Sequence, residues 1–234
     1  MDETVVTTAE TLDSQPDDGR ANDGRVSRAA RTREAVVDAL LALIDRGNLR
    51  PTGREIADEA GVSLRSVYVH FEDVESLFVA AATRHGERME ALRGPCVLTG
   101  TLEERTASLI DRRRRIFEEG AQVRRSALLQ EPFSPVLTRA LELGRAAMRA
   151  EVEQVFAPEL SATPDDEGRR LASVLDVATN AGTWECLRSH QHLSPDDAAA
   201  LVHDMVMAGL RAWDQPTPAA GDHPPPSAPA GKPG

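Results

Sequence analysis

The stretch from Thr52 to Phe71 constrains this chain most, because its residues fit two short helices joined by a tight turn. Thr52 and Glu55 have the spacing of a capping box, which predicts a helix start. Gly61 follows that helix and can adopt a left-handed backbone without steric cost. Ser63 can then cap a second helix, whose apolar positions are Leu64, Val67 and Phe71. This arrangement predicts a helix-turn-helix, a unit that places its second helix in the DNA major groove.

The region around this motif also resembles a known family. The matching residues lie between about positions 28 and 80 and fit the signature of TetR-type (tetracycline-repressor-type) transcriptional regulators. They are Arg33, Ala39, Gly47, Thr52, Ile56, Ala57, Ala60, Gly61, Val62, Ser63, Tyr68, His70, Phe71, Glu75 and Leu77. One position departs from the pattern: many members carry a lysine near the start of the fourth helix, where this chain has Val74. The phosphate contact that the resemblance implies there is therefore absent, or another residue supplies it.

The formal net charge of −11 is unusual for a DNA-binding protein, but the charges are unevenly distributed. Residues 25–71 hold eight arginines and six acidic residues, a formal charge of +2, so the motif region is the least acidic part. Local charge matters more than total charge for docking on DNA. Because +2 is small, we expect modest non-specific affinity, and a specificity that depends on geometry and base contacts.

Composition favours an all-helical protein, because aromatic residues make up only 3% of the chain while Ala, Leu, Val and Arg are plentiful. We expect about nine helices in total. Three of them form a helix-turn-helix DNA-binding domain at 25–71, and a fourth, at about 72–92, connects it onward. A larger helical effector-binding and dimerisation domain spans 72–213. The acidic segment 1–24 and the Pro/Ala-rich segment 214–234 are expected to be disordered tails.

Apolar periodicity and capping residues place the remaining helices. The first is expected from about Ser27 to Arg46. Those of the larger domain are expected at about 101–119, 121–130, 135–156, 164–190 and 195–213. The last two are apolar on more than one face: in 164–190, Val174 lies on one side, and Val177, Trp184 and Leu187 lie on another. A helix that is apolar on two faces needs two partners, so we expect a four-helix interface in a homodimer, as the resemblance also implies.

Nine residues are candidate DNA contacts. They are Arg28, Thr52, Arg54, Ser63, Leu64, Arg65, Ser66, Tyr68 and His70. Arg65 can donate to a guanine O6/N7 pair, whereas Leu64 either touches a thymine methyl or packs. Tyr68 and His70 are candidates for phosphate contacts, and for Tyr68 the alternative is packing with an exposed hydroxyl. The helix that begins at Thr52 can hold a phosphate at its N-terminus. Arg28 belongs either to an arm on the flanking DNA or to a solvated helix start.

The resemblance further implies a small-molecule pocket in the C-terminal domain. The candidate lining residues are Arg113, Phe117, Phe133, Met148 and Trp184, with ordinary core packing as the alternative for each. The arginine run 112–115 is flanked by acidic residues, which is typical of a solvated, salt-bridged helix face. Arg113, however, lies near an apolar stripe, and a buried arginine needs a partner. We expect that partner to be Glu151 or an anionic ligand, and we favour the internal pair.

The motif predicts a DNA-binding transcriptional regulator, and the family resemblance implies a homodimeric repressor that a small-molecule ligand releases from a palindromic operator. The alternatives are a helix-turn-helix regulator without an effector and an enzyme built on a helical bundle. No Glu-x-x-His pair, glycine-rich phosphate loop or nucleophile elbow supports the enzyme, so no catalytic residue, metal or cofactor is expected. The two cysteines fit no metal spacing and no apolar run has membrane-spanning length, which predicts a cytoplasmic protein. The family resemblance implies a bacterial one, nucleoid-associated when bound to DNA.

Overall fold

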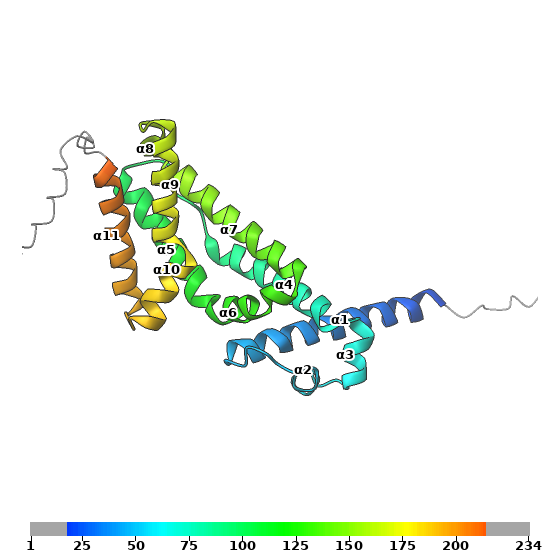
Figure 1. Cartoon of the computed structure of the whole chain (residues 1–234). Coiled ribbons are helices and arrows are strands. Elements are labelled where there is room, and N and C mark those ends of the chain that lie inside the picture. Colours follow the sequence, from blue (N-terminus) through cyan, green and yellow to red (C-terminus); the bar gives the residue numbers. More distant parts are fainter. Residues whose placement is uncertain (1–17, 214–234) are drawn as a thin grey trace, which may run out of the picture. The chain divides into compact units, whose positions relative to one another are not determined.

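The computed structural model describes residues 18–213, and within that range the secondary structure is helical with no strand (Figure 1), which confirms the all-helical prediction. Side chains are described from Arg28 onward, except that of Val74. In chain order the helices are α1 (Asp18–Asp45), α2 (Gly53–Ala60), α3 (Leu64–His70), α4 (Val74–Arg93), α5 (Leu102–Glu119), α6 (Ala121–Gln130), a 3-10 turn η1 (Glu131–Phe133), α7 (Pro135–Val155), α8 (Ala157–Ser161), α9 (Asp165–Thr179), α10 (Ala181–Glu185), a π-helical turn η2 (Cys186–His190) and α11 (Pro195–Trp213).

The N-terminal helix is longer than expected. It begins at Asp18, so residues 18–24, expected as the end of a disordered tail, are helical. Extending an existing helix costs far less than nucleating one, and an acidic residue is favourable at a helix N-terminus. The expected disorder of residues 1–17 and 214–234 falls outside the described residues.

More helical segments occur than the nine expected, for two local reasons. The one-turn helix α8 was not foreseen. The helix expected at 164–190 is divided at Asn180, whose backbone is extended (φ −83°, ψ 168°). The Asn180 side chain accepts a hydrogen bond from the Thr183 backbone N–H at 2.9 Å and so caps a new helix, α10. A capping residue within an apolar periodic stretch can therefore start a new helix where the periodicity alone predicts one continuous helix.

Two compact units divide the described chain. The first contains residues up to Gly86 together with Gln122–Leu137, and the second contains Glu87–Ala121 and the residues from Thr138 onward. Helix α4 crosses the division without a break, so its N-terminal part belongs to the first unit and its last turns to the second.

The core of the first unit forms where α1, α2 and α3 pack on one another. Its central side chains, all with 3% exposure or less, are Val36, Leu40, Ile44, Ile56, Val67, Phe71 and Leu77. The segment 122–137 joins this core through Val123 and Leu137, and Ser126 donates to the Leu49 carbonyl at 2.8 Å. The unit is therefore a helix-turn-helix supported by a long N-terminal helix.

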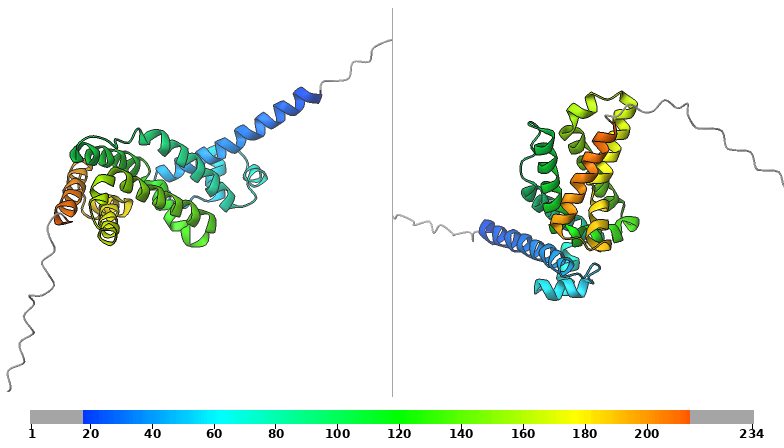
Figure 2. Two further views of the ribbon diagram at one scale, coloured as in Figure 1. Left: turned by 90° about the horizontal axis from the view of Figure 1, so that it is seen from above. Right: turned by 90° about the vertical axis from the view of Figure 1, so that its left-hand side faces the viewer.

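The second unit is a bundle in which α11 packs against α5 and α9 (Figures 1 and 2). One part of its core is aliphatic and includes Leu109, Val152, Leu175 and Val206, each completely buried. The other part is richer in aromatic and Met side chains: Met89, Phe117 and Trp184 pack there with Ile110, Ile116, Leu187, Ala198 and Val202. These two clusters fix the helices that carry the buried arginines described below.

Candidate functional site

The first helix of the motif starts at the capping box that the sequence predicts. The Thr52 hydroxyl accepts from the Glu55 backbone N–H at 3.3 Å, and the Glu55 carboxylate accepts from the Thr52 backbone N–H at 2.7 Å. The Thr52 N–H, and next the Thr52 hydroxyl, lower the pKa of Glu55 below its usual range because both donate to its charged form. The box fixes where α2 begins, and thus where its unpaired N–H groups lie.

The turn and the second cap are also confirmed. Gly61 has φ 65°, the left-handed conformation that ends α2 at no steric cost for glycine. Two residues later Ser63 is extended, and its hydroxyl accepts from the Ser66 backbone N–H at 3.1 Å. Ser63 is therefore the N-cap of α3, and its side chain is exposed.

Helix α3 has one buried and one exposed face. Val67 on the helix and Phe71 at its C-cap are 3% and 2% exposed, so they anchor it on α1 and α2. Tyr68 is 51% exposed, and Arg65 is exposed without a hydrogen bond or ion pair to any described residue. Leu64 is 41% exposed, while Ser66 and His70 are half-buried. The predicted contacts at 64, 65 and 68 thus reach solvent from a firmly packed helix.

An arginine of α1 holds the end of α3. The Arg33 guanidinium donates to the His70 carbonyl at 2.9 Å, and its Cζ lies 4.2 Å from the centre of the Phe71 ring. A cation near a helix C-terminus is favourable, and so is a cation over an aromatic face. Arg33 is one of the residues that carry the family resemblance, but no local pattern predicts its contact with His70, which lies 37 residues away along the chain. Arg33 fixes α3 relative to α1.

Tyr68 lies against the start of α2. A Cβ built on Gly53 would be 3.2 Å from the Tyr68 hydroxyl oxygen and 3.3 Å from the Leu64 Cδ1 atom. Gly53 is the first residue of α2, so its N–H and that of Arg54 lack an intrahelical acceptor. Glycine at this position therefore lets a phenol hydroxyl and free helix N–H groups lie close together on the surface.

Two other predicted contacts lie apart from this group. Arg28 is exposed near the start of the described side chains, and its backbone carbonyl accepts a hydrogen bond from the Thr32 hydroxyl at 3.0 Å. Arg54 is exposed on α2. Val74, where the family pattern has lysine, is the first residue of α4, and its side chain lies outside the described residues.

The five residues predicted to line a ligand pocket do not all lie together. Phe117 and Trp184 pack in the second unit with ring centroids 6.1 Å apart, and Met148 packs against the same cluster. Arg113 lies in that unit as well, and its Nη2 atom donates to the Met148 carbonyl at 2.9 Å. Phe133 is different: it belongs to the first unit and is 75% exposed. Trp184, expected on a second apolar face, is instead a core residue bonded to Glu118 at 2.8 Å.

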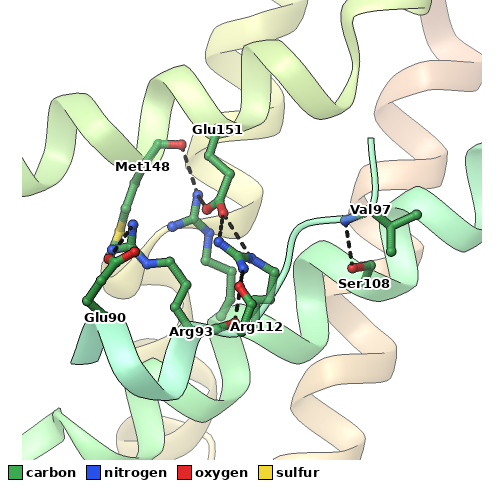
Figure 3. Close-up of polar contacts among 9 residues, drawn as sticks. Glu90, Arg93, Val97, Ser108, Arg112, Met148 and Glu151 are labelled. Atoms are coloured by element: carbon green, nitrogen blue, oxygen red, sulfur yellow. Dashed lines mark hydrogen bonds and ion pairs between the residues drawn. The ribbon is translucent and has the colours of Figure 1, made fainter. Parts of the chain in front are cut away.

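The predicted pair of Arg113 and Glu151 is present, with Nη2 and Oε2 3.0 Å apart. Figure 3 shows Glu151 close to Arg112 and Met148. Arg112 was expected on a solvated face but is buried, because α5 packs on several sides within its unit. It contacts the same carboxylate through Nε at 2.9 Å, and its Nη1 donates to the carbonyls of Arg93 and Gly94. We call Arg93, Arg112, Arg113 and Glu151 the arginine cluster.

A hollow of about 390 Å³ opens elsewhere on the second unit, over α7, α8 and α9. Its lining includes Arg149, Glu153, Asp165 and Arg169 and none of the five predicted pocket residues. In the part of the chain that the structure describes, no helix combines the length and hydrophobicity of a membrane span, and no group of three acidic, His or Cys side chains has metal-binding geometry.

The fold and motif define an all-helical protein with an N-terminal helix-turn-helix and a second helical unit. Solved transcriptional regulators have this fold. One from Rhodococcus sp. Rha1 matches with a TM-score of 0.59 and 17% identity, over 81% of this chain and 99% of the regulator. A TetR transcription regulator from Haloarcula marismortui matches with a TM-score of 0.55 and 15% identity, over 79% of this chain and 98% of the regulator. A protein from Mesorhizobium loti assigned to the TetR family matches with a TM-score of 0.55 and 23% identity, over 79% of this chain and 98% of that protein.

These similarities establish that the chain shares its fold with TetR-family regulators, as its motif residues predicted. No protein-family model and no curated protein sequence matches the chain.

Proposed function

We propose that this protein is a DNA-binding transcriptional regulator that acts as a homodimer and represses transcription until a small molecule releases it. The observation that carries the proposal is the capped helix α3, which is anchored by Val67 and Phe71 and exposes Arg65 and Tyr68. Residues near the N-terminus of a recognition helix meet base edges in the major groove. The shared fold with solved transcriptional regulators supports the same conclusion.

In the proposed complex, Arg65 reads sequence and the surrounding groups hold the phosphate backbone. Arg65 is exposed and makes no hydrogen bond or ion pair with the described chain, so its donors are available for a guanine O6/N7 edge. The Tyr68 hydroxyl and the first N–H groups of α2 lie close together at Gly53 and would bind one phosphate. Thr52, Ser63, Ser66, His70, Arg28 and Arg54 remain candidates for the surrounding contacts.

The proposed dimer forms through α9 and α11. These helices pack together in the second unit (Figure 2), yet Val177 of α9 is 60% exposed and Val174 39%. On α11, Leu201 is 37% exposed, and Gly209 lies close to α9, since a Cβ at this position would be 3.3 Å from Val174 Cγ1. Exposed valine and leucine beside a close helix pair suit a four-helix interface with a second copy.

The proposed release of DNA passes through α4. This continuous helix contributes residues to both compact units, and its last turn is bonded to the arginine cluster through the Arg93 carbonyl. A ligand that prefers one arrangement of α4 would shift the spacing of the two recognition helices in the dimer. Successive major grooves need a spacing of about 34–36 Å, so a small shift would weaken binding.

A mobility-shift assay on DNA upstream of the neighbouring genes tests the proposal. We expect a shifted band that competes away with specific duplex and weakens as salt increases. A protein that shifts none of these duplexes at low salt would contradict the proposal. Titrating small molecules into the preformed complex then tests whether release depends on a ligand.

A further inference from the structure

Arg113 is a buried cation with unused hydrogen-bond donors. Its side chain is 2% exposed, and only Nη2 is engaged, with the Glu151 carboxylate at 3.0 Å and the Met148 carbonyl at 2.9 Å. Its Nε and Nη1 atoms are buried and have no partner among the described residues. A buried donor without an acceptor is costly, more so on a charged group. The packing of α5 against α7 therefore leaves Arg113 incompletely satisfied.

The neighbouring buried arginines are satisfied, which sets Arg113 apart. Arg105 of the same helix has a carboxylate to itself: its Nη2 is 2.5 Å from Glu159 and its Nη1 also donates to Glu159 and to the Val155 carbonyl. Arg112 donates through Nε and Nη2 to Glu151 and through Nη1 to two backbone carbonyls. Among these three buried arginines of the described chain, Arg113 is the one whose buried donors lack an acceptor.

Charge in the arginine cluster is also unbalanced. Two buried arginines, 112 and 113, share the carboxylate of Glu151, and Figure 3 shows its contact with Arg112. Arg93 adds a third guanidinium, whose Nε is buried without a partner and whose Nη1 lies 3.4 Å from the largely exposed Glu90. Burial lowers the pKa of Arg113, Glu151 opposes that change, and Arg93 adds to it. The cluster holds three guanidinium groups and one carboxylate, a formal charge of +2, so a further negative charge beside it would be favourable.

The surroundings of this positive charge are apolar and adaptable. Met148, whose carbonyl accepts from Arg113, packs against the aromatic cluster of the second unit. That cluster includes Met89, Phe117 and Trp184. Methionine side chains rearrange readily around irregular partners. A ligand that reaches Arg113 would therefore meet the charged groups of the arginine cluster on one side and apolar side chains on the other.

We propose that Arg113 binds the carboxylate of an apolar organic acid, which is the class of effector that this protein senses. That the acid is an effector rests on the proposed function, whereas the binding of an acid at Arg113 does not. The carboxylate accepts from the free donors of Arg113, while the apolar body lies against Met148 and the aromatic cluster. Arg93, at the end of α4, adds a second cation beside the same anion, which connects the bound acid with α4.

Thermal unfolding of the full-length protein with matched acid and amide probes tests this proposal. The probes are benzoate with benzamide, and hexanoate with hexanamide, at constant ionic strength. We expect each acid, at about ten times its dissociation constant, to raise Tm by roughly 3–6 °C, and each amide to have little effect. Equal shifts with acid and amide, or no shift with either acid up to solubility, would overturn the proposal.

Two arginine variants of the same helix locate the effect. Arg113→Met should abolish the acid-dependent shift and should itself fold, because Arg112 and Glu151 remain as a balanced pair. Arg114→Met removes the same charge one position later, where the side chain is 38% exposed and pairs with Asp196, and it should keep the shift. An acid-dependent shift that survives in Arg113→Met would overturn the assignment. Should Arg113→Met not fold, Arg113→Gln and the wild-type acid–amide comparison still decide the question.

Failure of this inference is distinguishable from failure of the proposed function. The thermal assay contains no DNA, so it reports the acid site alone. A protein that binds duplex DNA but shows no acid-dependent shift would keep the function and lose the ligand class. A protein that shows the acid-dependent shift but binds no DNA would keep the ligand class and lose the proposed function.

Discussion

Gly53 and Tyr68 are in close contact: a Cβ at position 53 would lie 3.2 Å from the Tyr68 hydroxyl oxygen. The contact brings the exposed face of α3 against the first turn of α2. Because Gly53 begins α2, the helix N–H groups that have no intrahelical acceptor lie beside this hydroxyl. One residue without a side chain thus makes room for the proposed phosphate site.

We predict that Gly53→Ala weakens DNA binding by roughly tenfold, because the new Cβ displaces the Tyr68 hydroxyl and costs about one charge-assisted hydrogen bond. Fluorescence anisotropy with labelled duplex measures the affinity. The matched control is Gly144→Ala, an exposed position within α7 with no atom within 4 Å of the added Cβ. It should stabilise the fold by about 0.5–1 kcal/mol and leave DNA affinity unchanged. Equal affinities for both variants would contradict the contact's proposed role.

Arg65→Ala should cost about 1–3 kcal/mol of affinity on the preferred site and relax the preference at one base position. The reason is that Arg65 is exposed without a partner on the helix that would enter the groove. Tyr68→Phe is the comparison: it should weaken binding by a similar factor on every sequence, because a phosphate contact carries no base information. Binding to a library of single-base variants distinguishes the two patterns. If Arg65→Ala keeps both affinity and preference, Arg65 does not contact a base.

Val177→Asp should convert the dimer to a monomer and greatly reduce operator affinity, because it buries an unpaired carboxylate in the proposed α9–α11 interface. Analytical ultracentrifugation measures the mass. Leu143→Asp makes an equivalent change at a 55% exposed position of α7 and should remain dimeric. A dimeric Val177→Asp would show that the two copies meet elsewhere.

Much of the first unit could be predicted from sequence because its signals are local. Thr52 with Glu55, Gly61 and Ser63 each act within four residues, so spacing alone locates the helix ends. The role of Arg33 escaped prediction since its partners are 37 residues away. Such a contact depends on how α1 and α3 pack, which no pattern within either helix specifies.

In the second unit, too, local sequence signals could be predicted and features that depend on packing could not. The pair of Arg113 and Glu151 could be anticipated because each interrupts an apolar stripe, and a buried charge needs a partner. Arg112 is adjacent in sequence to a charged run that resembles a solvated face, and only the packing of α5 shows it to be buried. Asn180 is a residue type that favours helix N-caps, but the continuous apolar periodicity around it predicted an uninterrupted helix.

Glu151→Gln should destabilise the fold by about 3–5 kcal/mol, because Arg112 and Arg113 would remain buried without the carboxylate that pairs with both. Urea unfolding measures the loss. Replacing all three groups together, as Arg112→Met, Arg113→Met and Glu151→Leu, should recover most of the stability, since no buried charge is left unpaired. A loss below about 1 kcal/mol for Glu151→Gln would mean that water satisfies the two arginines.

Acid should weaken the fold partly through Glu118. The Arg188 guanidinium, by hydrogen bonding, holds the pKa of this carboxyl below its ordinary 4.5, with burial opposing and the Trp184 N–H assisting. A lowered pKa in the folded state gives stability that is present above the unfolded pKa and is lost as pH falls through the folded value. The stability difference between wild type and Glu118→Gln should therefore shrink as pH falls below 4.5. A difference that is constant from neutral pH to acid unfolding would contradict this.

Selection of duplexes from a random pool tests the central proposal most directly, because it asks whether two copies of α3 read DNA together. We predict that wild-type protein enriches sites with two-fold symmetric halves whose centres lie about one helical turn, 10–10.5 base pairs, or a multiple of it apart. Arg65→Ala should enrich the same spacing with one base position relaxed. Recovery of no sequence above the starting pool, or the same sequences with the same preference for both proteins, would contradict the proposal.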